Sequence, residues 1–293
     1  MQDFVSICEH IQTVTGQRFE LLSATPVAGG DINSAFCLQG SQARYFVKLN
    51  QADLLAMFEA ELAGLQNLAR TGTLRVPTPV VCGQTAEQAF LVLEYIEFGS
   101  ATKASQRLLG RQLAQLHQQP QDFFGWHRDN TIGSTKQINS KNSDWLAFWR
   151  EQRLGFQLRL AAKNGYGGKL QTLGERLAQE LDGLFDQQPR SSLLHGDLWG
   201  GNSAVDQQGR PVIFDPACYF GDREADLAMT ELFGGFSADF YAAYNEFYAL
   251  PPGYNIRKTL YNLYHILNHL NLFGGGYLRQ AENMLALLLA ELR

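Results

Sequence analysis

Apolar and polar positions in the first ninety residues predict a small β-sheet with two helices. Residues 2–15 place Phe4, Ile7, Cys8 and Ile11 on one helical face, and residues 54–68 form a second amphipathic helix. Runs rich in β-branched and aromatic residues predict strands near 18–27, 34–38, 44–49, 79–83 and 89–93. The expected order is therefore three strands, the second helix and two further strands.

The remainder of the chain has a mainly helical pattern. Helices are predicted at 108–118, 144–162 and 170–187 and through most of 223–293, whereas the polar stretch 120–143 is expected to be a long loop. Short strand-like runs occur at 191–195, 203–205 and 211–214, with a hairpin turn at 206–209. We expect an α+β fold with a small β-rich N-lobe, residues 1–94, and a larger, mainly helical C-lobe, residues 95–293.

Composition limits the classes of partner. The 293 residues carry a net charge of −5 and no Lys/Arg-rich block, so neither nucleic acid nor an anionic membrane is an expected partner. No apolar run approaches the roughly 18–20 residues of a membrane span, and residues 1–9 lack the pattern of a secretory signal. The scattered Cys8, Cys37, Cys82 and Cys218 predict reduced thiols. We expect a cytoplasmic monomer.

The strongest candidate for chemistry is the segment His195-Gly196-Asp197, with Asn202 at the fifth position after the aspartate and an apolar strand that ends in Asp215. This spacing is typical of phosphoryl-transfer centres. Asp197 is the candidate catalytic base, and Asn202 and Asp215 offer the hard oxygen ligands that Mg²⁺ prefers. His195 is expected to brace the loop. The alternative interpretation is a turn rich in Gly and Asp that has no chemical role.

Lys48 ends a predicted strand and is a candidate ligand for the ATP phosphates, although a surface lysine on an edge strand is the alternative. A carboxylate from the helix 54–68 would hold it; Glu61 is favoured over Glu59, and both could instead be solvated. Gly29 and Gly30 lie in the turn between the first two predicted strands, before Lys48 in the chain. They are candidates for covering the phosphates, or form an ordinary hairpin turn.

Three further features have two interpretations each. Asp226 opens an apolar helix, where it is either a carboxylate at the positive end of the helix dipole or a buried anchor for the catalytic loop. His265 and His269 have the spacing of half a metal site, but packing is favoured because no acidic ligand is near. An aromatic stripe is expected to be core, with some members lining a pocket: Trp145, Phe148, Trp149 and Phe156.

These motifs resemble those of the fructosamine kinase (ketosamine-3-kinase) family, which belongs to the aminoglycoside phosphotransferase-like kinases. The likeness covers roughly residues 20–280 and includes the segments 46–48, 57–61, 124–133, 194–202, 213–217, 220–224, 233–236 and 270–277. Two positions depart from related patterns. Pro216-Ala217 follow Asp215, so no switchable activation segment is expected, and Asp31 stands where some members have a cysteine, so a redox switch there is not supported.

The resemblance implies a bilobal protein-kinase-like fold and ATP- and Mg²⁺-dependent phosphorylation of the 3-hydroxyl of a sugar–amine adduct. Ribulosamine, erythrulosamine and fructosamine remain alternatives, as do a free adduct and a glycated lysine, and the role would be deglycation or metabolite repair. The backbone of Glu94, Tyr95 and Ile96 would hold adenine. Other hypotheses are a kinase for an aminoglycoside, choline or another amino alcohol, a nucleotide-binding scaffold without catalysis, and a metal-dependent hydrolase that uses His195 and Asp197.

Overall fold

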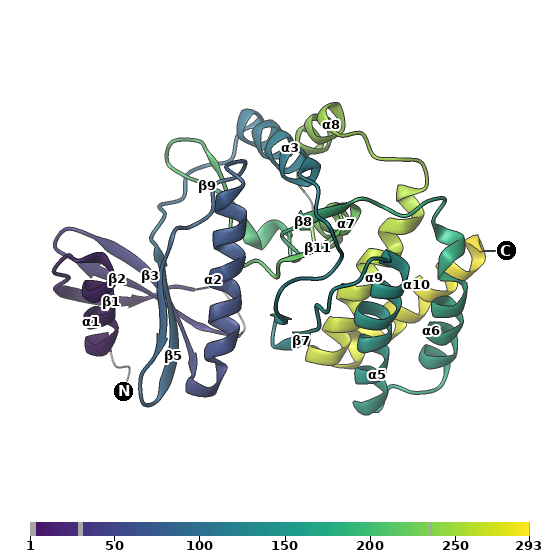
Figure 1. Cartoon of the computed structure of the whole chain (residues 1–293), viewed down its shortest axis with the longest axis horizontal. Helices are drawn as coiled ribbons and strands as arrows, with labels where there is room; N and C mark the ends of the chain where they lie inside the picture. Colours follow the sequence, from purple (N-terminus) through teal and green to yellow (C-terminus); the bar gives the residue numbers. More distant parts are fainter. Residues whose placement is uncertain (1–3, 29–31, 235, 293) are drawn as a thin grey trace. The chain divides into compact units, whose positions relative to one another are not determined.

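The computed structural model describes residues 4–28, 32–234 and 236–292 (Figure 1). The chain forms two compact units, one made of residues 1–105 and 203–216 and the other of residues 106–202 and 217–293. The chain therefore leaves the second unit after Asn202 and returns to it after Pro216. The lobes expected from the sequence had one boundary, after residue 94, whereas the first compact unit continues to Ser105 and includes the later segment.

A five-stranded antiparallel sheet forms the centre of the first unit, in the order β1-β2-β3-β5-β4. Along the chain, three strands are followed by a helix and two further strands, as the sequence predicted. The helix α2 separates β3 from β4. The elements are α1 (Phe4–Thr15), β1 (Leu21–Pro26), β2 (Ser34–Gly40), β3 (Arg44–Gln51), η1 (Ala52–Leu54), α2 (Leu55–Arg70), β4 (Pro79–Gln84) and β5 (Gln88–Glu94).

The two faces of the sheet are covered by different helices, α1 and α2 (Figure 1). Val47 and Leu49 of β3 belong to one apolar cluster with Ile7 and Ile11 of α1. Because side chains alternate along a strand, Lys48, between Val47 and Leu49, projects toward the opposite face. The pattern of β3 thus directs the lysine toward the side of the sheet on which α2 packs.

The hairpin of β9 (Ser203–Val205) and β10 (Pro211–Ile213) belongs to the first unit. Val212 forms a parallel bridge with Arg75, and the Ile213 N–H donates to the Arg75 carbonyl at 3.1 Å. The next residue, Phe214, stacks on Phe98 with ring centroids 5.6 Å apart. These contacts explain why a segment distant in sequence folds with the sheet.

The second unit is mainly helical, and its long helix α9 (Tyr254–Phe273) is buried over most of its length. Two short antiparallel pairs accompany the helices: β8 (Ser191–Leu194) with β11 (Tyr219–Asp222), and β6 (Asn130–Ile132) with β7 (Thr135–Gln137). The other elements are α3 (Lys103–Gln118), which begins in the first unit, α4 (Trp145–Phe148), η2 (Trp149–Leu154), α5 (Gly155–Lys163), α6 (Lys169–Glu180), η3 (Leu181–Leu184), η4 (Gly200–Asn202), α7 (Glu224–Leu232), α8 (Ala238–Phe247), η5 (Gly275–Tyr277) and α10 (Leu278–Glu291).

The α+β class is confirmed, and the differences from the sequence expectations concern short strands. The predicted loop 120–143 contains β6 and β7, and the sequence analysis gave no strand at β11. The equally short β8, β9 and β10, which were predicted, each end in two aliphatic residues, whereas β6, β7 and β11 contain no such pair. Of the aromatic stripe, Trp145, Phe148 and Trp149 are buried in the core as expected, whereas Phe156, in α5, is only partly buried. Within the described residues, no helix is long and apolar enough to cross a membrane.

Candidate active site

In the first unit, Lys48 is held by two carboxylates. Its Nζ lies 2.7 Å from Glu61 Oε1 on α2 and 2.5 Å from Asp215 Oδ1, which follows β10. Lys48 is 5% exposed, so the alternative of a solvated surface lysine is excluded. Glu61, which the sequence analysis favoured over Glu59, pairs with Lys48.

The charge state of this cluster follows from burial and pairing. Burial acts to lower the pKa of Lys48, but the Asp215 and Glu61 carboxylates outweigh it and raise that pKa above its ordinary value. Burial and the Asp215 charge raise the pKa of Glu61, and Lys48 partly opposes them. A permanently charged ammonium is therefore fixed between two carboxylates, where an anionic phosphate would find a positioned cation.

Asp215 has an unusual backbone conformation. Its φ of 58° is the only positive φ of a non-glycine residue among those that the structure describes. Such a conformation is uncommon for residues with a Cβ, although Asp tolerates it better than most. It costs on the order of 1–3 kcal/mol unless neighbours determine it. The chain thus turns sharply at Asp215 immediately after β10, which directs its carboxylate to Lys48.

In the second unit, Asp197 lies in a loop after the buried strand β8. The Asn202 side chain closes this loop, because its Nδ2 donates to the Asp197 carbonyl at 2.9 Å and to Asp197 Oδ2 at 3.2 Å. Gly196 has φ 83°, and a Cβ there would lie 2.1 Å from the Ala217 carbonyl oxygen. Only glycine fits this position without moving the backbone. His195 Nδ1 accepts the Asp197 N–H at 3.3 Å, as expected of a bracing residue.

Asp226 is the buried anchor of this loop. It is 1% exposed, and its carboxylate accepts the backbone N–H groups of His195 at 2.7 Å and Gly196 at 2.8 Å. His117 Nε2 lies 3.2 Å from the same carboxylate. Burial acts to raise the pKa of Asp226, but the hydrogen bonds from His117 and the loop lower it. Of the two interpretations of Asp226, the anchor is confirmed.

The anchor is extended by a buried chain of hydrogen bonds. Because Asp226 is ionised, His117 Nε2–H donates to it, and the neutral His117 Nδ1 accepts the Tyr244 hydroxyl at 2.9 Å. Arg223 Nη1 donates to the Tyr244 oxygen at 3.0 Å. Burial lowers the pKa of His117 in spite of Asp226, which is consistent with a neutral ring. Each donor in the chain therefore has an acceptor.

We expect Asp226→Asn to reduce both stability and kcat. Asparagine has one acceptor oxygen in place of two and directs an NH₂ group at the donors, so the free energy of unfolding should fall by about 2–4 kcal/mol. The wild-type advantage should be complete above about pH 4, the ordinary Asp value, and disappear as the pH falls through the lowered pKa of folded Asp226. Urea unfolding at several pH values measures this. The control Asp239→Asn, at the start of α8, should change stability by less than about 0.5 kcal/mol.

The remaining nucleotide candidates are less complete. The Glu94 N–H donates to the Thr78 carbonyl at 2.8 Å, and the Glu94 carboxylate binds Arg75 at 2.8 Å. A backbone contact to adenine would therefore use the Glu94 carbonyl or the Tyr95 and Ile96 backbone. Gly29 and Gly30 lie outside the described residues.

The predicted magnesium ligands have suitable chemistry. With Nδ2 donating to Asp197, the other end of the Asn202 amide is its Oδ1, an acceptor, and Asp215 supplies a carboxylate whose side chain is 43% exposed. Mg²⁺ typically takes one or two protein oxygens and completes its shell with water and phosphate. Among the described residues there is no group of three or more His, Cys, Asp or Glu arranged to hold a metal. Asn202 and Asp215 belong to different compact units, each offers an oxygen that suits Mg²⁺, and their joint role as metal ligands remains a prediction.

A family model described as fructosamine kinase matches residues 4–291 of the chain. The chain belongs to the fructosamine kinase family. A probable ketoamine kinase of Synechocystis sp. is 49% identical over 281 residues, 96% of this chain and 95% of that protein. A chloroplastic protein-ribulosamine 3-kinase of Oryza sativa subsp. japonica is 40% identical and covers 92% of this chain and 80% of its own length.

A crystal structure of a Haemophilus somnus protein assigned as a fructosamine-3-kinase has a TM-score of 0.90 and 30% identity to this fructosamine kinase family member. It covers 98% of this chain, and the match covers 97% of that chain. The protein-kinase-like fold expected from the resemblance is therefore confirmed. The individual roles of the catalytic and ligand-binding residues remain predictions.

The sequence analysis did not identify a partly exposed aromatic cluster that begins two residues after Asp197. Trp199 and Phe233 have ring centroids 6.5 Å apart, and Phe233 and His269 4.8 Å apart. His269 also contacts Phe273 and Tyr277, at 5.4 and 5.2 Å. The sequence signal was Trp199, two residues after Asp197. For His269 the sequence analysis favoured core or pocket packing over half of a metal site, and it did not indicate the contact with Phe233, which is distant in sequence.

Proposed function

We propose that this fructosamine kinase family member transfers the terminal phosphoryl group of ATP to the 3-hydroxyl of a ketosamine. The observation that carries the proposal is the closed loop that presents Asp197, anchored by Asp226 and tied by Asn202, in a chain that matches the family over residues 4–291. The names of the relatives, ketoamine kinase and ribulosamine 3-kinase, support this acceptor class.

Each polar group has a distinct role in this reaction. Asp197 accepts or aligns the proton of the acceptor hydroxyl as the oxygen attacks phosphorus. Lys48 neutralises phosphate charge, and Glu61 keeps its ammonium in place. Asn202 and Asp215 would hold Mg²⁺, which supplies charge neutralisation to the phosphates when bound. Phosphoryl transfer depends mostly on such positioning and electrostatic stabilisation, so these groups meet its main requirements.

The aromatic cluster of Trp199, Phe233, His269, Phe273 and Tyr277 supports the acceptor side of the proposal. Trp199 is 38% exposed and Phe273 54% exposed, so aromatic surface remains accessible close in sequence to Asp197. A ketosamine combines sugar C–H groups with a secondary amine that is protonated near neutral pH. Aromatic faces attract cations and pack against C–H surfaces. We therefore assign the amine-bearing part of the acceptor to this cluster.

Trp199→Ala is expected to raise KM for the ketosamine by about 5- to 30-fold, equivalent to about 1–2 kcal/mol, and to leave KM for ATP within about twofold. Steady-state kinetics with each substrate varied in turn measures both constants. Phe247→Ala, another exposed aromatic of the same unit, is the matched control and should change neither. An equal rise in both KM values for Trp199→Ala would contradict the assignment.

A panel of acceptors tests the proposed function itself. The purified protein, ATP and Mg²⁺ are assayed with amine adducts of ribulose, erythrulose and fructose, with a ribulose-glycated lysine peptide, and with an aminoglycoside and choline. Activity confined to ketosamines is expected. The sugars differ by one or two hydroxymethyl groups, so discrimination among them should be modest, about 1–3 kcal/mol. A kcat/KM that is highest for the aminoglycoside or choline would overturn the acceptor class.

A further inference from the structure

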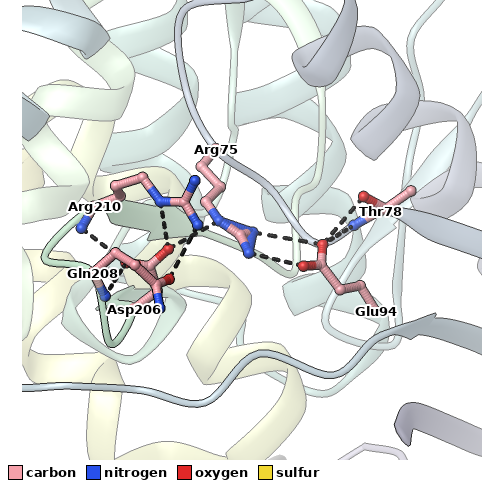
Figure 2. A network of polar contacts seen from close by, with 6 residues as sticks. All are labelled: Arg75, Thr78, Glu94, Asp206, Gln208 and Arg210. Carbon is pink, nitrogen blue, oxygen red and sulfur yellow. Dashed lines mark hydrogen bonds and ion pairs between the residues drawn. The ribbon is translucent and has the colours of Figure 1, made fainter. Parts of the chain in front are cut away.

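Arg75 lies between two carboxylates that come from distant parts of the first unit (Figure 2). It belongs to the segment between α2 and β4. Its Nε lies 3.1 Å from Asp206 Oδ2, and its Nη2 lies 2.8 Å from Glu94 Oε1. Asp206 is in the turn of the β9–β10 hairpin, and Glu94 ends β5. One guanidinium therefore joins the central sheet to the hairpin that precedes Asp215.

The Asp206 end of this connection is rigid. Asp206 is 2% exposed, and its Oδ1 accepts the N–H groups of Gln208 and Arg210, which closes the hairpin turn (Figure 2). Its Oδ2 accepts both Arg75 Nε and Arg210 Nε. Burial acts to raise the pKa of Asp206, but the hydrogen bonds from Arg210 and Gln208 hold it below its ordinary value. The turn thus presents a fixed anion to Arg75.

The Glu94 end is equally well defined. Glu94 Oε2 accepts the backbone N–H and the hydroxyl of Thr78, each at 3.1 Å, while the Glu94 N–H donates to the Thr78 carbonyl. Thr78 is three residues after Arg75. Both ends of the segment 75–78 are therefore bonded to Glu94, at the end of β5. Arg75 cannot move relative to the sheet without breaking several of these bonds.

The main chain of Arg75 contacts the same hairpin at its other end. The Arg75 carbonyl accepts the Ile213 N–H at 3.1 Å, two residues before Asp215. Arg75 therefore contacts the hairpin at the turn through its side chain and at the end of β10 through its backbone. The positive φ of Asp215 persists only if its surroundings determine it. A hairpin fixed at two points supplies that constraint.

We propose that Arg75 is a positioning residue that sets Asp215 for metal binding, by fixing the β9–β10 hairpin to the sheet through Asp206 and Glu94. The inference rests on the proposed function, in which Asp215 holds Mg²⁺ with the nucleotide. Residues that orient metal ligands from outside typically change metal affinity by about 10–100-fold when they are removed. A role in stability alone would instead lower the melting temperature and leave the magnesium requirement unchanged.

The test compares Arg75→Met with Arg210→Met in the full chain. Both variants lose an arginine bond to Asp206, but the Arg210 side chain is 56% exposed and does not reach Glu94. Two quantities are measured: the Mg²⁺ concentration that gives half of the ADP-induced rise in melting temperature, and the Mg²⁺ concentration for half-maximal kinase activity. Arg75→Met should raise both about tenfold, with kcat partly restored at saturating Mg²⁺. Arg210→Met should stay within about twofold of wild type.

Arg75→Lys keeps the charge but not the planar fork that binds two carboxylates, so its magnesium requirement should lie between those of wild type and Arg75→Met. If Arg75→Met does not fold, Arg75→Lys decides the question on the same scale. An Arg75 variant that folds with the wild-type magnesium requirement overturns the inference. The ADP measurement needs no phosphoryl transfer, so a wild-type protein inactive on every ketosamine would overturn the proposed function separately.

Discussion

Asp197→Asn is expected to lower kcat for ketosamine phosphorylation by about 10³- to 10⁴-fold, at the upper end of what a catalytic base contributes. The substitution preserves shape but removes the group that accepts or aligns the hydroxyl proton. The bond from Asn202 Nδ2 to the Asp197 carbonyl uses the backbone, so the loop should keep its conformation. The measurement is ATP-dependent phosphorylation of a ribulose–amine adduct under saturating conditions.

Two controls separate the loss of chemistry from misfolding. The melting temperature of Asp197→Asn and its stabilisation by ADP with Mg²⁺ should remain close to those of wild type. Asp186→Asn makes the same chemical change at an exposed position of the second unit and should retain full activity. Activity above about one tenth of wild type in Asp197→Asn would remove Asp197 from the role of base.

Lys48→Met is expected to lower kcat by about 10²- to 10³-fold, because a positioned cation for the phosphates is lost. It should also destabilise the protein by about 3 kcal/mol, the lower end of the effect of breaking a buried pair. Glu61, whose side chain is 11% exposed, would lose its partner, and its pKa, already raised by burial, would rise further. Protonation of Glu61 at low pH removes the cost of a buried carboxylate without a cation. The stability difference from wild type should therefore be larger at pH 8 than at pH 5.

The double variant Lys48→Met/Glu61→Gln tests this account of Lys48→Met. It should recover much of the lost stability, since no buried carboxylate is left without a cation on α2, but it should recover no activity. Lys103→Met, an exposed lysine of the first unit, is the control for both measurements. A stability loss that is independent of pH, or active Lys48→Met protein, would contradict the assigned role.

Local patterns predicted the elements that carry the candidate residues. Lys48 was a candidate because it lies on a strand predicted from the sequence, and the helical face of α2 favoured Glu61 over Glu59; the structure pairs Lys48 with Glu61. The spacing of the Asp197 loop predicted its bracing by His195. These predictions succeeded because strand alternation, helix periodicity and turn chemistry depend on residues close in sequence.

Local sequence patterns did not predict three of the short strands or the contacts between residues that are distant in sequence. The strands β6, β7 and β11 lack the aliphatic pair that ends β8, β9 and β10, so their sequences carried no strand signal. The two interpretations of Asp226 could not be separated, because its partner His117 is 109 residues away and its burial depends on how the helices pack. The contact of His269 with Phe233 likewise joins distant segments, whereas Phe273 and Tyr277 follow His269 closely in sequence.

The sequence by itself offered the residues for chemistry through their spacing and local periodicity, and the resemblance of its motifs to the fructosamine kinase family implied the kinase-like class. Only the tertiary structure showed which of those residues are fixed by hydrogen bonds and ion pairs, and which residues are their partners. Asp206 is 131 residues from Arg75, and Asp215 is 167 residues from Lys48. Such pairs form when packing brings distant segments together, and the resulting burial sets their charges. The backbone conformation of Asp215 and the anchoring of the Asp197 loop therefore result from tertiary packing and not from the local sequence.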